Sequence, residues 1–286
     1  MGTWGAGLYQ DDDASDLKNT IALLSKIPID GDKMLAILLS NRSDGGEFDA
    51  DGGPAFWLVV ADQFEKRGIR SAHVLERALH VIESGADLRD MQAREMSAKD
   101  LEKRAKVLDA LAVQLRNPRP ERARPNAKRP PAMVVETGEA YAFPTMRNNA
   151  INPWMKSREQ AKFVPDGWGA MLILGQGRAY DWLPWCAYQC LDTLNTREAT
   201  LADVRASRLL TTDTSAIAVP RRLHLQRIDV RRLGRLELDP QRVAARVAFR
   251  PNGHTPEEVV VIGWSFYLRS SSQRVSDGIP VSDLLA

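Results

Sequence analysis

The sequence of 286 residues has little cysteine, with two residues of this type, and it has no long apolar run. Two cysteines cannot build a disulfide framework, so we expect a chain suited to a reducing compartment. The longest apolar runs, such as residues 55–61, fall far short of the about 20 residues that a membrane-spanning helix needs. The opening residues lack the basic start and apolar stretch of a signal peptide. We therefore expect a cytoplasmic protein without a membrane span.

Histidine is also scarce, with four residues, and the complete motifs of catalysis or metal binding are missing. Cys186 and Cys190 form a C-x3-C pair, but no second pair or nearby histidine completes a zinc site. There is no Walker A motif, no G-x-G-x-x-G and no G-x-S-x-G. We therefore predict no catalytic residue, no metal and no cofactor. An uncharacterised hydrolase is the third alternative, because the members of a catalytic triad need not be adjacent in sequence.

Charge is distributed unevenly along the chain. Residues 1–115 carry 14 basic and 20 acidic side chains. Residues 116–131 carry six basic side chains and one acidic side chain, and residues 132–286 carry 19 basic and 16 acidic side chains. Residues 117–131 contain five prolines and almost no apolar side chains, which predicts an exposed, semi-rigid linker. This composition predicts a domain at 1–116, a linker at 117–131 and a second domain at 132–286.

The first domain shows the apolar period of helices, with recognisable ends. Pro54 suits the first turn of one helix, which would end at Gly68. Ser71 and Gly85 would bound the next helix, and Ser97 would cap a last helix that reaches Arg116. Two further helices are expected between the aspartates at 11–13 and residue 40. The prediction is a bundle of about five helices.

From Met133 onward, the spacing of apolar residues favours strands. Strands are expected at 140–143, at 168–174 before a hairpin turn at Gly175–Gly177, and at 179–190. Further strands are expected near Ile217 and at 224–228, 243–249 and 259–268, with one short helix within 201–209 and a frayed tail after Arg269. The fold class is therefore α+β: a helical bundle followed by a β-rich domain, built as a curved antiparallel sheet or a partly open barrel.

Two charged sets are candidate contact residues. Acidic side chains gather near the first helix and in the following loop, where they could bind a basic partner; they are Asp11, Asp12, Asp13, Asp16, Asp44, Glu47, Asp49 and Asp51. Residues 205–250 hold 11 arginines against four acids. Some alternate with apolar residues, as on one face of a strand, and could bind an anion; they are Arg221, Arg222, Arg227, Arg231 and Arg232. Four tryptophans within 154–185 are either core residues or an aromatic contact surface.

Two segments resemble known bacterial families. The opening, with Trp4, Gly5, Gly7, Asp12, Ala14 and Asp16, together with Phe56, Trp57 and Asp62, resembles the family called domain of unknown function 4259. Asp11 and Glu65 stand where that family usually has asparagine and tryptophan. Residues 138–144 and Gly167-Trp168-Gly169 resemble the immunity protein 26 family, with residues 145–166 as an insertion. The first resemblance implies no known reaction, and the second implies a β-rich domain that neutralises a toxin.

These observations favour a non-enzymatic bacterial protein-binding module, an immunity or antitoxin-like protein whose partner is a toxin or another protein of a competition system. The alternative is a nucleic-acid-associated accessory protein that uses the arginine-rich segment and the basic linker. Nucleic acid is not the favoured partner, because no known DNA- or RNA-binding module is visible.

Overall fold

A computed structural model describes the chain except for residues 1–4, 11, 41–52, 121–127, 212–215 and 248–265. The chain divides into two compact units, Met1–Lys128 and Arg129–Ala286, which we call the helical unit and the sheet unit. The boundary falls inside the segment that its proline and arginine content marks as a linker. Within the described ranges, no helix has both the length and the apolar character needed to cross a bilayer.

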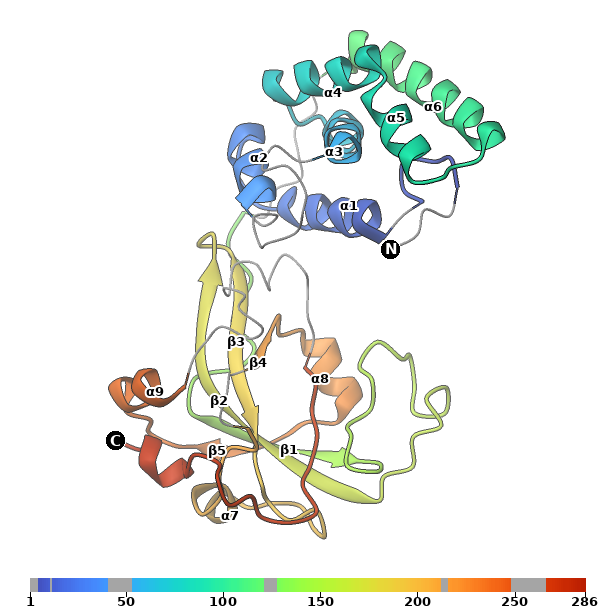
Figure 1. Cartoon of the computed structure of the whole chain (residues 1–286). Helices are drawn as coiled ribbons and strands as arrows, with labels where there is room; N and C mark the ends of the chain where they lie inside the picture. The colour runs from blue at the N-terminus through green and yellow to red at the C-terminus, as the bar shows by residue number, and fades with distance from the viewer. Residues whose placement is uncertain (1–4, 11, 41–52, 121–127, 212–215, 248–265) are drawn as a thin grey trace. The chain divides into compact units, whose positions relative to one another are not determined.

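The described part of the helical unit contains six α-helices, one more than the pattern predicts. They are α1 (Asp12–Leu24), α2 (Gly31–Ser40), α3 (Pro54–Arg67), α4 (Ala72–Ser84), α5 (Ala86–Ala93) and α6 (Ala98–Arg116). Every residue of α3 from Phe56 to Glu65 is buried, and α3 lies in the middle of the unit in Figure 1. The other helices therefore pack around an apolar central helix, which explains its almost continuous run of apolar side chains.

The predicted helix ends are confirmed where capping residues define them. Pro54 occupies the first turn of α3, and Gly68 ends that helix. The side chain of Ser71 accepts a hydrogen bond from the N–H of Val74 at the start of α4, as an N-cap residue should. Gly85 has a left-handed backbone and ends α4, but it also begins α5. The sequence pattern does not indicate α5, because Gly85 is both the C-cap of α4 and the N-cap of α5.

The beginning of the linker is held by two side chains of the helical unit. The buried carboxylate of Glu65 accepts a hydrogen bond from the backbone N–H of Arg119 at 2.6 Å. Arg70 pairs with Glu65 at 3.2 Å and donates to the carbonyl oxygen of Arg119. Pro118 lines an apolar cavity of about 230 Å³ beside this contact. Residues 118 and 119 thus belong to the folded helical unit.

In its described residues, the sheet unit contains an open, antiparallel five-stranded sheet with the order β4-β3-β2-β1-β5. The strands are β1 (Glu139–Thr145), β2 (Gly167–Ala179), β3 (Leu183–Cys190), β4 (Ala216–Ala218) and β5 (Arg231–Arg235). The α+β fold class predicted from the sequence is therefore confirmed. Apolar residues cover both faces of the sheet: Tyr141 and Phe143 belong to one buried cluster, whereas Ala140 and Leu172 belong to the other.

Three short helices pack around the sheet in the part of the unit that the structure describes, and this corrects the prediction of one. They are α7 (Leu201–Arg205), α8 (Arg222–Ile228) and α9 (Pro240–Arg246), with α8 opposite α7 and α9 in Figure 1. The strands predicted at 224–228 and 243–249 are wrong over their described residues. In α8 the buried residues His224 and Ile228 are four apart, which is helical spacing. Asp239 caps α9 through the N–H of Gln241. The strand predicted at 259–268 lies mostly outside the described residues.

The predicted hairpin turn and the predicted frayed tail are also wrong. Strand β2 continues through Gly175–Gly177 with a bulge after Ile173, and the turn to β3 occurs at Tyr180 and Asp181, which have positive φ. A side chain at Gly177 would meet the ring of Trp185, so this glycine permits close packing and makes no turn. The C-terminal residues fold back as the 3₁₀-helix η2 (Val281–Leu284), and its two end residues are fully buried. Apolar side chains in the tail explain that packing.

Candidate functional site: an arginine and tryptophan surface

Four of the residues that resemble the family motif lie in the interior of the helical unit, whereas Asp16 is exposed. Ala14, Phe56, Trp57 and Asp62 are buried, whereas Trp4 and the side chain of Asp12 lie outside the described part. The hydroxyl of Tyr9 donates to the Asp62 carboxylate, which also pairs with Lys66 at 2.7 Å. Burial, and then the hydrogen bond to Asp62, raise the pKa of Tyr9 well above its usual value. This network has a clear structural role, because it fixes the opening segment on α3.

A second buried contact holds the glycine turn of the same motif. Arg104 of α6 forms a bidentate ion pair with Asp87 of α5, with both distances at 2.9 Å. The two side chains are 3% and 0% exposed. Arg104 also donates to the carbonyl oxygen of Gly7 at 2.8 Å. The sequence pattern gave no indication of this pair, because both residues read as ordinary charges of a helix surface.

The predicted acidic contact surface is only partly described. Asp13 and Asp16 are exposed on α1. Asp11 and the acidic loop residues Asp44, Glu47, Asp49 and Asp51 lie outside the described residues, as does the side chain of Asp12. The structure therefore places two of the eight predicted residues, and the proposed patch stays a prediction.

The five predicted anion-binding arginines do not share a strand face, which corrects that prediction. Arg231 and Arg232 lie on β5, and both are neutralised by carboxylates. Arg231 pairs with Glu198 at 2.9 Å and with Asp229 at 3.3 Å, and Arg232 pairs with Glu139 at 2.6 Å. These β5 arginines stabilise the sheet edge, and their charges are already balanced.

The other three arginines belong to α8. Arg221 is the N-cap residue, and Arg222 and Arg227 lie within the helix. No described carboxylate forms an ion pair with any of the three. The guanidinium of Arg221 lies over the ring of Trp154 at 5.4 Å, and Arg227 donates to the carbonyl oxygen of Pro153 at 3.0 Å. Three arginines without a described carboxylate partner therefore gather at this helix.

The loop that carries Trp154 is fixed against α8. Its ring contacts the ring of His224 edge to face, with centroids 4.5 Å apart. Arg158 in the same loop pairs with Asp229 at 3.0 Å. Burial, and then the charges of Arg221 and Arg227, lower the pKa of His224. These surroundings favour the neutral imidazole, whose ring supports Trp154.

Large apolar side chains are exposed on this loop and on α8. Trp154 and Leu223 are each 53% exposed, and Met155 is 37% exposed. We call the set Trp154, Met155, Arg221, Leu223 and Arg227 the Trp154 surface. Tryptophan and arginine are the side chains that most often carry binding energy in interfaces. The tryptophan-rich stretch of the sequence hinted at this surface, but only the fold shows that α8 completes it.

The two cysteines belong to the buried core on one face of the sheet. Cys186 and Cys190 lie on β3, and both thiols are buried and free. Burial raises the pKa of the Cys190 thiol from 9.0 to about 11, and burial also raises the pKa of Cys186. No group of three or more potential metal ligands occurs in the described portion of the chain.

We expect neither cysteine to react in the folded protein, because buried neutral thiols are poor nucleophiles. An aromatic disulfide reagent at about pH 8 should release no chromophore until urea unfolds the chain, after which two thiols per chain should react. Stability should also fall as pH rises from about 9 to about 11, because the unfolded chain loses thiol protons that the folded chain keeps. Reaction of either thiol in the native protein would contradict the burial.

Comparison with known proteins adds no relative: no family model, curated protein or solved structure matches this chain. The two family resemblances therefore stay predictions, and any functional proposal depends on the geometry described above.

Proposed function

We propose that this chain is a non-enzymatic protein-binding module that contacts its partner through the Trp154 surface. The observation that supports the proposal most directly is the exposed Trp154, whose ring contacts Arg221 and His224 of the segment that also exposes Leu223. Exposed apolar patches with polar rims mark many contact sites, and tryptophan is among the side chains that most often carry binding energy there. Here the supporting ring and the loop contacts hold Trp154 in place.

The chemistry of the surface favours an acidic protein partner. Arg221, Arg222 and Arg227 lack described carboxylate partners, so carboxylates of another protein could pair with them and speed association. Leu223 and Met155 favour a protein rather than a nucleic acid, because apolar side chains gain more from an apolar pocket than from a phosphate backbone. The resemblance to immunity proteins suggests the specific role: neutralising a toxin in bacterial competition.

The proposal predicts that Trp154→Ala weakens binding of the partner by about 30-fold, which corresponds to about 2 kcal/mol. Proteins encoded beside this gene are the candidates, purified singly and titrated against the full chain by calorimetry. Val164→Ala is the matched control, because Val164 lies in the same loop, is 74% exposed and is not part of the Trp154 surface. A toxin partner should also stop growth when it is expressed alone, and co-expression of this chain should restore growth.

Equal affinity of the wild type and Trp154→Ala for an identified partner would place the contact elsewhere. In that case Asp13→Asn with Asp16→Asn would test the acidic surface of α1. Asparagine removes both charges with little change in shape, so slower association at low salt would assign the contact to the helical unit.

Nucleic acid is the second candidate, because the same three arginines beside an exposed ring could bind phosphate and stack a base. A labelled single strand of about 20 nucleotides distinguishes the two functions. Binding that weakens steeply with salt, and that is lost in Arg222→Gln, would favour nucleic acid. Absence of binding at low salt would exclude this alternative.

A further inference from the structure

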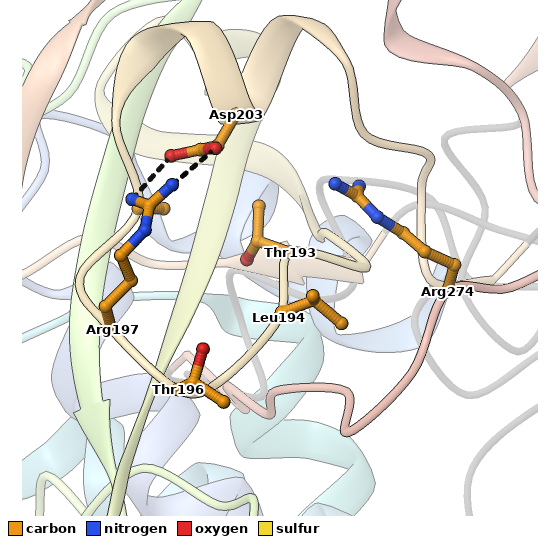
Figure 2. A pocket seen from close by; sticks show the side chains of 7 residues that line it. Thr193, Leu194, Thr196, Arg197, Asp203 and Arg274 are labelled. Atoms are coloured by element: carbon orange, nitrogen blue, oxygen red, sulfur yellow. Dashed lines mark hydrogen bonds and ion pairs between the residues drawn. The ribbon is translucent and has the colours of Figure 1, made fainter.

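A small cavity lies in the sheet unit, between the segment that follows β3 and the C-terminal segment. Its volume is about 80 Å³, and its polar lining comes from Thr193, Thr196, Arg197, Asp203 and Arg274. None of these residues belongs to the Trp154 surface. Figure 2 shows Arg197 and Arg274 on opposite sides of Thr193; the guanidinium group of Arg197 is directed toward Asp203, and that of Arg274 points toward the Thr193 side. Two guanidinium groups therefore line the cavity, and each also has a carboxylate partner.

The hydroxyl of Thr193 is the group that most needs a partner here. Thr193 is 2% exposed, and its Oγ1 atom has no hydrogen-bond partner among the described residues. A buried hydroxyl without a partner costs roughly 1–3 kcal/mol relative to a bonded one, so such groups are rare in native proteins. The threonine lines the cavity, and a bound polar ligand there would satisfy it.

Arg197 is fixed in position and still has N–H groups that make no described hydrogen bond. It pairs with both carboxylate oxygens of Asp203, at 2.8 and 2.9 Å, and donates to the carbonyl oxygen of Glu198. These contacts use three of the five N–H donors of a guanidinium group. Asp203 also accepts from the backbone N–H and the hydroxyl of Thr200. The acid is therefore occupied, whereas Arg197 can still donate.

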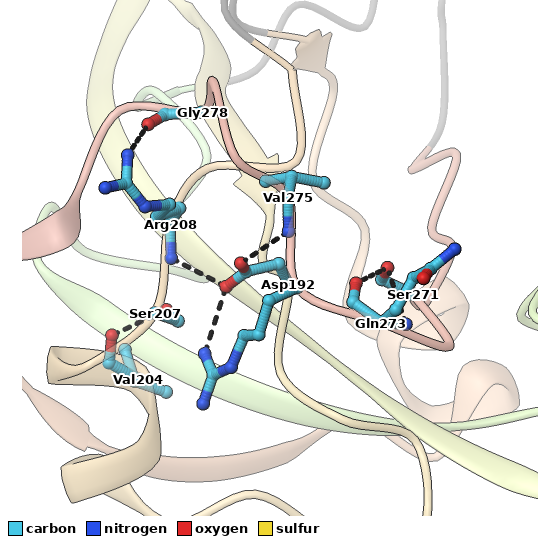
Figure 3. Close-up of polar contacts among 9 residues, drawn as sticks. Asp192, Val204, Ser207, Arg208, Ser271, Gln273, Val275 and Gly278 are labelled. Atoms are coloured by element: carbon cyan, nitrogen blue, oxygen red, sulfur yellow. Dashed lines mark hydrogen bonds and ion pairs between the residues drawn. The ribbon is translucent and has the colours of Figure 1, made fainter.

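Arg274 is fixed by a different carboxylate. Figure 3 shows Asp192, which is fully buried and accepts from the backbone N–H groups of Arg208 and Val275, at 2.7 and 3.0 Å, and from Arg274 at 3.1 Å. The charge of Asp192 is thus shared among three donors. Among contacts of the described residues, this one uses a single N–H of Arg274, so four donors remain.

The groups left over in the cavity are donors, because the two nearby carboxylates are already occupied. Two arginines can bind several oxygens of one anion with fixed geometry, and the Thr193 hydroxyl lies between them. Leu194, 47% exposed, also lines the cavity and could contact an organic group attached to that anion. We propose that this cavity binds a phosphate group, either as the free ion or as a phosphate monoester.

The experiment uses the full chain in a buffer free of phosphate, with inorganic phosphate and glycerol phosphate as separate probes. Calorimetry gives the affinity, and the melting temperature is compared with chloride at equal ionic strength. We expect saturable binding and a higher melting temperature with at least one probe, since a ligand that binds only the native state stabilises it. Tighter binding of glycerol phosphate would identify a monoester site, and tighter binding of inorganic phosphate would identify a site for the free ion.

Three variants separate a binding role from a structural one. Thr193→Val should weaken binding about fivefold while leaving the melting temperature without ligand unchanged or higher, because it removes an unpaired buried hydroxyl. Arg274→Gln should weaken binding about tenfold or more, because it removes a charged donor. Arg205→Gln is the control, an exposed arginine on α7 outside the lining, and should bind like the wild type.

Three results would overturn the proposal. These are absence of saturable binding, equal effects of phosphate and chloride, and wild-type affinity in Thr193→Val. If Arg274→Gln fails to fold, Thr193→Val decides the matter alone, because the loss of its hydroxyl leaves every described hydrogen bond of the unit intact.

Discussion

Replacing Asp87 by alanine is expected to lower the free energy of unfolding of the helical unit by about 3–5 kcal/mol. The change leaves the guanidinium of Arg104 buried, with the carbonyl oxygen of Gly7 as its remaining described partner. A buried charge that loses its counterion carries a large desolvation penalty. Urea unfolding of the full chain, followed by far-ultraviolet circular dichroism, measures the effect, because six of the described α-helices belong to this unit.

Glu83→Ala is the matched control for Asp87→Ala. Glu83 pairs with Arg116 at 2.8 Å, but these side chains are 57% and 54% exposed. We expect little or no change, because water and salt screen exposed ion pairs. If Asp87→Ala were as harmless as the control, burial of the Asp87–Arg104 pair would not have the energetic weight assigned to it.

Replacing Gly138 by alanine is expected to destabilise the sheet unit by about 3 kcal/mol or more. Gly138 has φ of +86°, and a Cβ atom there would lie 2.2 Å from the carbonyl oxygen of Leu236. The glycine also donates to Ile173 and accepts from Leu236, at 2.8 and 2.9 Å. The backbone must therefore move at a point where three segments meet. Unfolding followed by tryptophan fluorescence reports the change.

Gly85→Ala separates conformational strain from collision. Gly85 also has a positive φ of +68°, but the nearest atom to an added Cβ is the Nη1 atom of Arg89 at 3.5 Å. Only the strain of a left-handed alanine remains, at about 1 kcal/mol. Equal losses for the two substitutions would show that the close approach to Leu236 is unimportant.

Helix ends in this chain are predictable from sequence because their determinants are local. Pro54, Ser71 and Ser97 act within one turn of their own helix, and the structure confirms each. The predicted turn at Gly175–Gly177 failed for a non-local reason. Glycine also permits close packing, and the ring that needs this space at Gly177 belongs to Trp185 on the next strand.

The arginine-rich segment shows the same limit. Apolar residues that alternate with arginine over a few positions fit a strand and a short helix equally well. The apolar period of residues 221–228 therefore does not distinguish a helix from a strand. The sequence also does not show which arginines pair with carboxylates. Glu139 is 93 positions away from Arg232, and only the sheet register brings them together.

The cavity beside Thr193 could not be predicted, because its lining comes from segments about 80 residues apart. The sequence indicates both parts of the Trp154 surface, the tryptophan-rich stretch and the arginines, but it does not indicate that they lie together. The contact between Trp154 and His224 joins them.

The hydrogen bond from Arg104 to Gly7 has a consequence for how the protein is made. It connects residues 97 positions apart, so the contact between Gly7 and Arg104 cannot form until most of the helical unit has left the ribosome. Chains emerge at about 5–20 residues per second, and contacts between distant residues slow folding relative to purely local ones. The opening segment therefore spends several seconds of synthesis without its contact to Arg104, and chaperones and proteases can reach it during that time.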